Sequence, residues 1–132
     1  MAFHSYATNL VAGDTNAFAD VFVHDRRDSW TTRYSVDSSD VQGDQDSLYP
    51  SVSADGLQVA FSSWATNLVP GDTNGWGDIF VCNLNIWGPE RIECVSVADD
   101  GTQGNHASGG ATLAARQVLP KGFPVESLGL VR

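Results

Sequence analysis

The stretch VAFSSWATNLVPGDTNGWGDIFVCN, residues 59 to 83, decides the fold because it occurs twice. It matches MAFHSYATNLVAGDTNAFADVFVHD, residues 1 to 25, at about fifteen of twenty-five positions without a gap, at an offset of 58 residues. Further along, YSVDSSDVQGDQDS (34 to 47) aligns with VSVADDGTQGNHAS (95 to 108) at an offset of 61, and the extra residues fall inside LNIWGPERIE (84 to 93). Self-similarity at a fixed period is typical of repeat proteins, in which each unit buries its apolar surface against the next.

Each unit is predicted to consist of β-strands. Short apolar runs alternate with turn residues in YPSVSADG, LQVAFSS, DIFVCNL and ERIECVSV, and no segment carries apolar residues at helical spacing. Asp55-Gly56 predicts a tight hairpin and Trp87-Gly88-Pro89 a wider one. VAF and DIFV are apolar on consecutive residues, which indicates a sheet buried on both faces, as in the stacked blades of a propeller.

The same segments carry a family resemblance. YPSVSADGLQVAFSS (49 to 63) followed by DIFVCNL (78 to 84) resembles the WD40-like, TolB-type (PD40) repeat of bacterial β-propellers, over roughly residues 1 to 108. The blades of that family carry a Pro-x-hydrophobic-Ser-x-Asp-Gly strand pair and an Asp-hydrophobic-aromatic third strand. The resemblance implies a bacterial protein in a periplasmic or extracellular setting, although the N-terminal residues show no secretory signal. Propellers host lyases, receptors and scaffolds, so fold alone does not give function.

The alignment of Met1 with Val59 predicts that the chain opens in the second strand of a blade. The expected fold is therefore all-β, with two four-stranded antiparallel propeller blades, the first lacking its innermost strand. We expect a partial blade over residues 1–47, a second blade over 48–108, and a possible extra strand, ATLAA (111 to 115), followed by an irregular tail, over 109–132.

An open pair of blades would expose apolar faces and unpaired strand edges. Our leading hypothesis is a homo-oligomer, a trimer or tetramer that closes a ring, in which ATLAA of one chain completes the first blade of its neighbour. Two alternatives stay open: the chain is a fragment of a longer propeller, or its C-terminal segment folds back as a lid.

Charge and composition exclude two classes of partner. The chain has 132 residues, with 7 Lys plus Arg against 16 Asp plus Glu, and its formal net charge of -9 repels phosphate backbones, which argues against nucleic acid. No apolar run approaches the roughly 20 residues that a membrane-spanning helix needs, so we expect no membrane insertion.

The repeated loop carries the candidate metal ligands. These are Asp14, Asn16 and Asp20 in the first copy and Asp72, Asn74 and Asp78 in the second. Calcium binds six to eight oxygens, and the loop resembles a shortened form of the calcium loops of integrin-type propeller repeats. An aromatic residue stands where that pattern has a carboxylate, so binding would be weak. The alternative interpretation is a turn that Asp72 caps through an Asx hydrogen bond, with Asn74-Gly75 supplying a positive φ and Asp78 anchoring the third strand.

Aromatic residues recur at equivalent positions in the two copies. Tyr6 aligns with Trp64 and Phe18 with Trp76, so rings are expected along one rim, where they either bind a protein or carbohydrate ligand or cover the hairpin beneath them. Cys82 and Cys94 lie symmetrically about Gly88, which leaves a disulfide or two free buried thiols open.

These patterns favour a non-enzymatic binding or scaffold module over an enzyme. The sequence contains no Gly-x-Ser-x-Gly elbow, and His4, His24 and His106 show no ligand spacing. Aspartates present in both copies suggest a structural role, because an active site is needed only once. The alternatives are a fragment of a propeller lyase or hydrolase and a truncated reading frame without selected activity.

Overall fold

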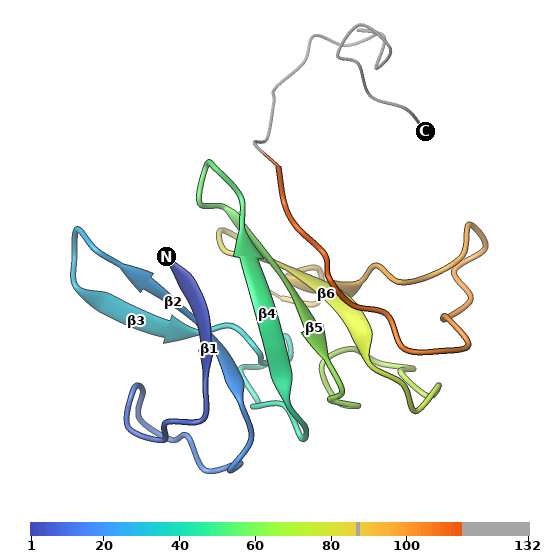
Figure 1. Cartoon of the computed structure of the whole chain (residues 1–132), viewed down its shortest axis with the longest axis horizontal. Coiled ribbons are helices and arrows are strands. Elements are labelled where there is room, and N and C mark those ends of the chain that lie inside the picture. Colours follow the sequence, from blue (N-terminus) through green and yellow to red (C-terminus); the bar gives the residue numbers. More distant parts are fainter. Residues whose placement is uncertain (87, 115–132) are drawn as a thin grey trace, which may run out of the picture.

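The computed structural model describes residues 1–86 and 88–114, and these form seven antiparallel β-strands in two sheets (Figure 1). The N-terminal sheet has the order β1-β2-β3 and the C-terminal sheet the order β4-β5-β6-β7. The strands are β1 (Ala2–Ser5), β2 (Asp20–Asp25), β3 (Trp30–Arg33), β4 (Ser47–Val52), β5 (Gln58–Ser63), β6 (Asp78–Asn83) and β7 (Ile92–Cys94). The expected all-β class, with one sheet of three strands and one of four, is confirmed. The described residues form no helix that could cross a membrane.

The two sheets repeat each other in detail. Phe3 stacks on Phe22 across β1 and β2 with ring centroids 5.7 Å apart, and Phe61 stacks on Phe80 across β5 and β6 at 5.9 Å, both at an interplanar angle of 25°. An isolated bridge follows each sheet, between Val36 and Gln42 and between the residues 61 positions later. The sequence repeat is therefore a structural repeat, and β1 is the equivalent of β5.

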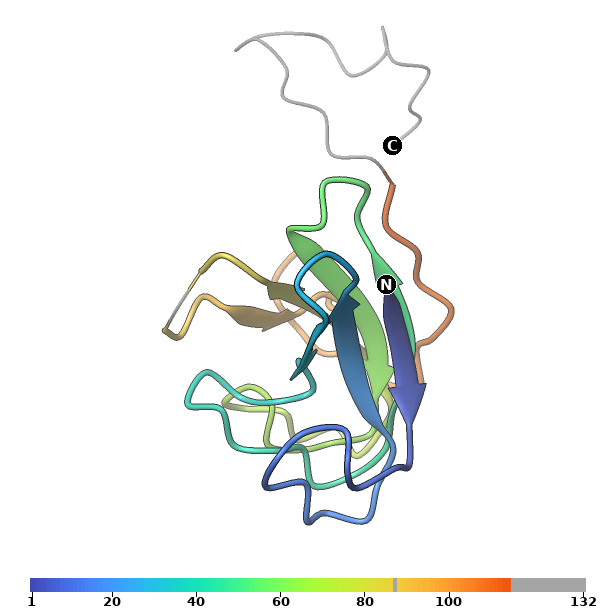
Figure 2. The ribbon, with the colours of Figure 1, turned by 90° about the vertical axis from the view of Figure 1, so that its left-hand side faces the viewer.

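The core lies between the sheets, which stack face to face (Figure 2). Val21 of β2 packs against a cluster contributed mainly by β5 and β6, and Leu68 is inserted from the loop between those two strands. The fully or nearly fully buried members are Val21, Val59, Phe61, Ala65, Leu68, Phe80, Cys82 and Ile92. Burial of this shared apolar face holds the two repeats together.

The hairpin prediction at Asp55-Gly56 is confirmed. Gly56 has a φ of 72° and donates its amide to the carbonyl of Ser53 at 2.9 Å, while Asp55 Oδ1 accepts the amide of Leu57 at 3.0 Å. In the wider turn, Trp87 lies outside the described residues. The predicted irregular tail also lies outside them from residue 115 onward.

The cysteines do not face each other. The register of β6 and β7 pairs Cys82 with Ile92 and Cys94 with Phe80, and both thiols are free. The hairpin is thus centred one residue earlier than Gly88. A one-residue change in the centre of a turn shifts the pairing by two positions, which is why the expected symmetry failed.

Candidate functional site

The asparagine of the repeated loop closes a turn in both copies. Asn74 Oδ1 accepts the amide of Trp76 at 3.1 Å, and its Nδ2 donates to the carbonyl of Gly104 at 3.0 Å. Asn16 makes the same two bonds at the same distances, to the amide two residues on and to the connector that follows β3. These are Asx-turn contacts, which the asparagines make in place of the expected Asp72, and Asp72 instead accepts from Gln103.

The last aspartate of each loop is fully buried at the start of a central strand. Ser35 donates its hydroxyl to Asp20 Oδ1 at 2.5 Å, and Ser96 donates to Asp78 Oδ1 at 2.7 Å. Each serine oxygen also accepts the amide that follows the aspartate, at 3.1 Å. The carboxylate and serine therefore join the central strand to the connector that leaves the outermost strand of the same sheet.

The two copies differ in what lies opposite the carboxylates. Arg33 Nη1 lies 3.5 Å from Asp14 Oδ1 and 3.4 Å from Asp20 Oδ2, and it donates to Gln42 Oε1 at 3.1 Å. At the offset of 61, the second repeat has Cys94 in place of the arginine. The first repeat thus carries its own cation between the two carboxylates, and the second does not.

The second repeat consequently holds carboxylates with few partners. Asp72 Oδ1 accepts from Gln103 Nε2 at 3.2 Å, whereas Asp78 Oδ2 is buried without a hydrogen-bond partner among the described residues. Burial raises the pKa of Asp72 and the charge of Asp78 raises it further. Burial also raises the pKa of the Cys94 thiol. The second site therefore has two carboxylates without the arginine that lies between them in the first.

Burial raises the pKa of Asp20 as well, although the hydrogen bond from Ser35 and the charge of Arg33 oppose the effect. No group of three or more His, Cys, Asp or Glu side chains within the described residues lies close enough to hold a metal ion. The six loop residues therefore offer two carboxylates in each copy, together with neutral oxygens. Calcium binding by them stays a prediction.

Tyr6 and Trp64 occupy equivalent exposed positions after β1 and β5. The Tyr6 hydroxyl donates to Asp46 Oδ2 at 3.4 Å, and the charge of Asp46 raises the pKa of Tyr6. The Trp64 ring lies against Gly77, where an added Cβ would stand 2.9 Å from Trp64 Cε2. Trp64 thus covers the backbone that enters β6.

The second aromatic pair lies in the repeated loops. Trp76 is partly exposed and stacks on His106 with ring centroids 4.1 Å apart and an interplanar angle of 19°, and Phe18 is half-buried. His106 is an exposed residue. Tyr6, Trp64 and Trp76 are thus exposed, and a role for these rings in binding stays a prediction.

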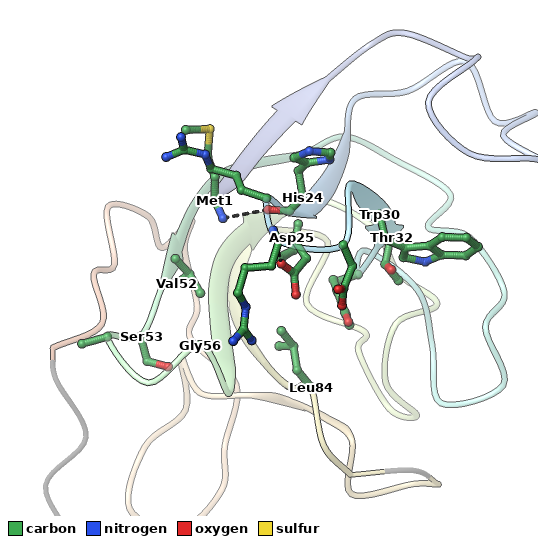
Figure 3. A pocket seen from close by; sticks show the side chains of 15 residues that line it. Met1, His24, Asp25, Trp30, Thr32, Val52, Ser53, Gly56 and Leu84 are labelled. Atoms are coloured by element: carbon green, nitrogen blue, oxygen red, sulfur yellow. Dashed lines mark hydrogen bonds between the residues drawn. The ribbon is translucent and has the colours of Figure 1, made fainter.

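A cleft of about 750 Å³ lies at the opposite end of the sheets, among the hairpins of both repeats (Figure 3). Val52 and Ser53 stand on one side and Trp30 and Thr32 on the other, with Leu84 below. The β2–β3 hairpin that borders it, Asp25 to Trp30, has two acidic and two basic residues, so its charge is balanced. The sequence did not predict this cleft because hairpins from two separate segments form it. The local signal was an aromatic residue, Trp30, at the end of a polar hairpin.

Comparisons with family models, with curated proteins and with solved structures find no match for this chain.

Proposed function

We propose that the chain is a non-enzymatic binding or scaffold module, built from TolB-type propeller repeats and completed by self-association. The observation that carries the proposal is a difference between equivalent positions. Apolar residues buried at the junction between the two repeats are exposed at the two ends of the pair.

Leu68 inserts between the sheets and is 1% exposed, whereas Leu10, its equivalent in the first repeat, is 36% exposed. Val59 is fully buried while the equivalent Met1 is largely exposed. The N-terminal sheet thus presents the same apolar half-interface that the C-terminal sheet uses internally, and nothing in the described chain covers it.

Apolar residues are also exposed at the other end of the pair, on the C-terminal sheet. Val36 is 4% exposed at the internal junction, whereas the equivalent Val97 is 40% exposed, and Val95 is exposed where the equivalent Tyr34 is half-buried. The two ends match the two sides of the internal junction, so one end of each copy would be buried against the other end of the next copy. Each Å² of apolar surface removed from water contributes about 25 cal/mol.

Contacts of this kind are head-to-tail, and they close into a ring when the rotation between copies permits. A trimer or tetramer would have the number of blades found in propellers. Light scattering should therefore report a particle of three or four chains, and a stable monomer at micromolar concentration would refute the proposal.

A non-enzymatic role is supported by the use made of the repeated polar residues. The asparagines close turns, and Asp20 and Asp78 anchor strands. These groups therefore have the same structural role in both repeats. A ligand of the module, a protein or a carbohydrate, would find aromatic surface beside the cleft at Trp30 and along the rim at Trp64.

Calcium would bind in the second repeat. Asp78 Oδ2 has no hydrogen-bond partner among the described residues, and Asp72 provides a second carboxylate, whereas Arg33 already supplies the cation in the first repeat. Two carboxylates with neutral oxygens form a weak calcium site. The test is the melting temperature of the metal-free protein as calcium is added.

A further inference from the structure

We propose that residues 108–113 of one copy add to the free edge of β1 in a second copy, as an innermost strand, with Ser108 opposite Ser5. The inference rests on the proposed self-association and specifies its geometry. Three features support it: the backbone of residues 108–113, the edge of β1, and polar residues next to both whose equivalents are in contact at the internal junction.

Residues 108–113 share two backbone features with β4. Ser108 donates its amide to the Gly77 carbonyl at 2.8 Å, as Ser47 of β4 does to the equivalent carbonyl of the first repeat, also at 2.8 Å. Gly110 has a φ of 75° at the repeat position of Tyr49, whose φ is 54° and where β4 shifts register. The segment thus enters and bends as β4 does, although it is not itself paired as a strand.

This segment pairs with no strand of the described chain. Its contact with β4 is a single hydrogen bond from the amide of Leu113 to Ser51 Oγ, at 3.0 Å. In Figure 1 it runs past β5 and β6 toward the hairpin end of the sheets. It shares these two features with β4 and lacks the partner that β4 has in β5.

β1 is a paired strand with one free edge. It pairs with β2 on one side only, whereas its equivalent β5 lies between β4 and β6. β4 of the same chain does approach β1, since the amide of Tyr49 donates to His4 Nδ1 at 3.3 Å. A comparable approach exists in the second repeat, where a Cβ on Gly109 would lie 3.7 Å from Ser62 Oγ while β4 remains paired with β5. An approach of this kind is thus compatible with a strand paired on the same edge.

The register follows from the repeat. In the C-terminal sheet Ser47 pairs with Ser63 and Leu48 with Ser62, and beyond the shift Ser51 pairs with Ala60. Moving β4 by 61 residues and β5 by 58 gives the pairs between copies. They are Ser108 with Ser5, Gly109 with His4, Thr112 with Ala2 and Leu113 with Met1.

A polar contact fixes this arrangement inside the chain. Asn67 Nδ2 donates to the carbonyl of Gln42 at 2.9 Å, and Asn67 Oδ1 accepts the amide of Asp44 at 3.1 Å. The amide of Thr66 donates to Asp44 Oδ1 at 2.7 Å. The loop after β5 is thereby joined to the connector that leads into β4.

Both halves of this contact recur at the ends of the repeat pair. Thr8 and Asn9 are exposed after β1, and Gln103 and Asn105 precede the segment that begins at Ser108. Asn105 stands where the internal junction has Asp44, and its amide oxygen can still accept a hydrogen bond from the backbone amide of Thr8. When residues 108–113 of one copy pair with β1 of the next, these four residues meet as their equivalents do inside the chain.

Cross-linking tests the register. The hydroxyl oxygens of Ser47 and Ser63 lie 2.8 Å apart, so cysteines at the equivalent Ser108 and Ser5 would meet at disulfide distance. A mixture of chains carrying Ser5→Cys and chains carrying Ser108→Cys should form a covalent dimer under mild oxidation. Ser5→Cys mixed with Thr112→Cys should not, nor should the unmodified chain, which controls for Cys82 and Cys94.

A matched pair of substitutions tests the polar contact. Asn9→Ala should raise the dissociation constant of the oligomer about tenfold, through lost hydrogen bonds, without lowering the melting temperature of the dissociated chain. Asn67→Ala, the same change at the internal junction, should lower that melting temperature. Equal effects of the two changes would overturn the assignment.

The outcomes separate this inference from the proposed function. An oligomer that forms no Ser5–Ser108 cross-link, or that cross-links through two copies of Ser108→Cys, refutes the register while leaving self-association intact. A particle that stays monomeric refutes both.

Discussion

Arg33 Nη1 lies 3.4 Å from Oδ2 of the fully buried Asp20, and no described residue plays this part for the equivalent Asp78. The guanidinium lies between two buried carboxylates, which would otherwise have no positive charge beside them. Two repeats with nearly the same loop therefore have different electrostatics, and each serves as the control for the other.

Replacement of Arg33 by cysteine should convert the first site into a copy of the second. The Arg33 side chain is 11% exposed, and its removal leaves Asp14 and Asp20 without a cation. Breaking a buried ion pair by removal of one partner costs about 3 kcal/mol. Urea denaturation of Arg33→Cys should show this loss, whereas Arg26→Cys, on the exposed β2–β3 hairpin, should show almost none. Similar losses in the two variants would mean that the ion pair is not the cause.

The reverse change, Cys94→Arg, should supply the missing cation to Asp72 and Asp78. It should raise the melting temperature of the metal-free protein and abolish its response to calcium. In the unmodified chain, calcium at about 100 times its Kd should stabilise the fold by about 2.7 kcal/mol.

Two asparagine substitutions complete the calcium experiment. Asp78→Asn should also abolish the response, although an amide oxygen can still accept the Ser96 hydroxyl, whereas Asp14→Asn should retain it. A melting temperature that calcium leaves unchanged in the unmodified chain would remove the metal from the proposed function.

Much of the fold was predictable because the repeat carries the strand pattern. Phe22 and Phe80 are the aromatic residues of the same Asp-hydrophobic-aromatic motif, and both are fully buried in central strands. The three strands of the first sheet followed from the alignment of Met1 with Val59, and the β4–β5 hairpin from Asp55-Gly56. These features depend on local sequence and on side-chain alternation, which a single sequence contains.

The candidate site was less predictable because its contacts are long-range. Arg33 reaches Asp14 and Asp20 only when β3 lies beside β2, and it falls between the two segments in which the repeats align. Extension of the second alignment by one more residue pair would have placed Arg33 opposite Cys94. The pairing of Cys82 with Ile92 depends on the centre of one turn, which composition does not determine.

Asp72→Asn should change how stability depends on pH. Burial and the charge of Asp78 raise the pKa of Asp72 in the folded state above its unfolded value, so the folded protein binds this proton more tightly. The ionised carboxylate therefore destabilises the fold: the penalty is absent below the unfolded pKa, grows as the pH rises toward the folded pKa, and is complete above it.

Without calcium, Asp72→Asn should thus be more stable than the unmodified chain at neutral pH, and this advantage should shrink as the medium is acidified toward the unfolded pKa. The introduced asparagine keeps an oxygen that can accept the Gln103 amide, so the hydrogen bond remains. Free energies of unfolding, measured with denaturant across this range, provide the test. An advantage that is constant with pH would exclude titration of Asp72 as its source.

Gly77→Ala should destabilise the second repeat through Trp64. An added Cβ would lie 2.9 Å from Trp64 Cε2, so the indole must move, at a cost of about 2 kcal/mol. The first repeat has alanine at the equivalent Ala19, and there the ring is the smaller Tyr6. The double variant Gly77→Ala with Trp64→Tyr should therefore recover most of the lost stability. Denaturant melts of the three variants give the coupling energy. If the two changes simply add, the contact between Gly77 and Trp64 does not explain why glycine stands at this position.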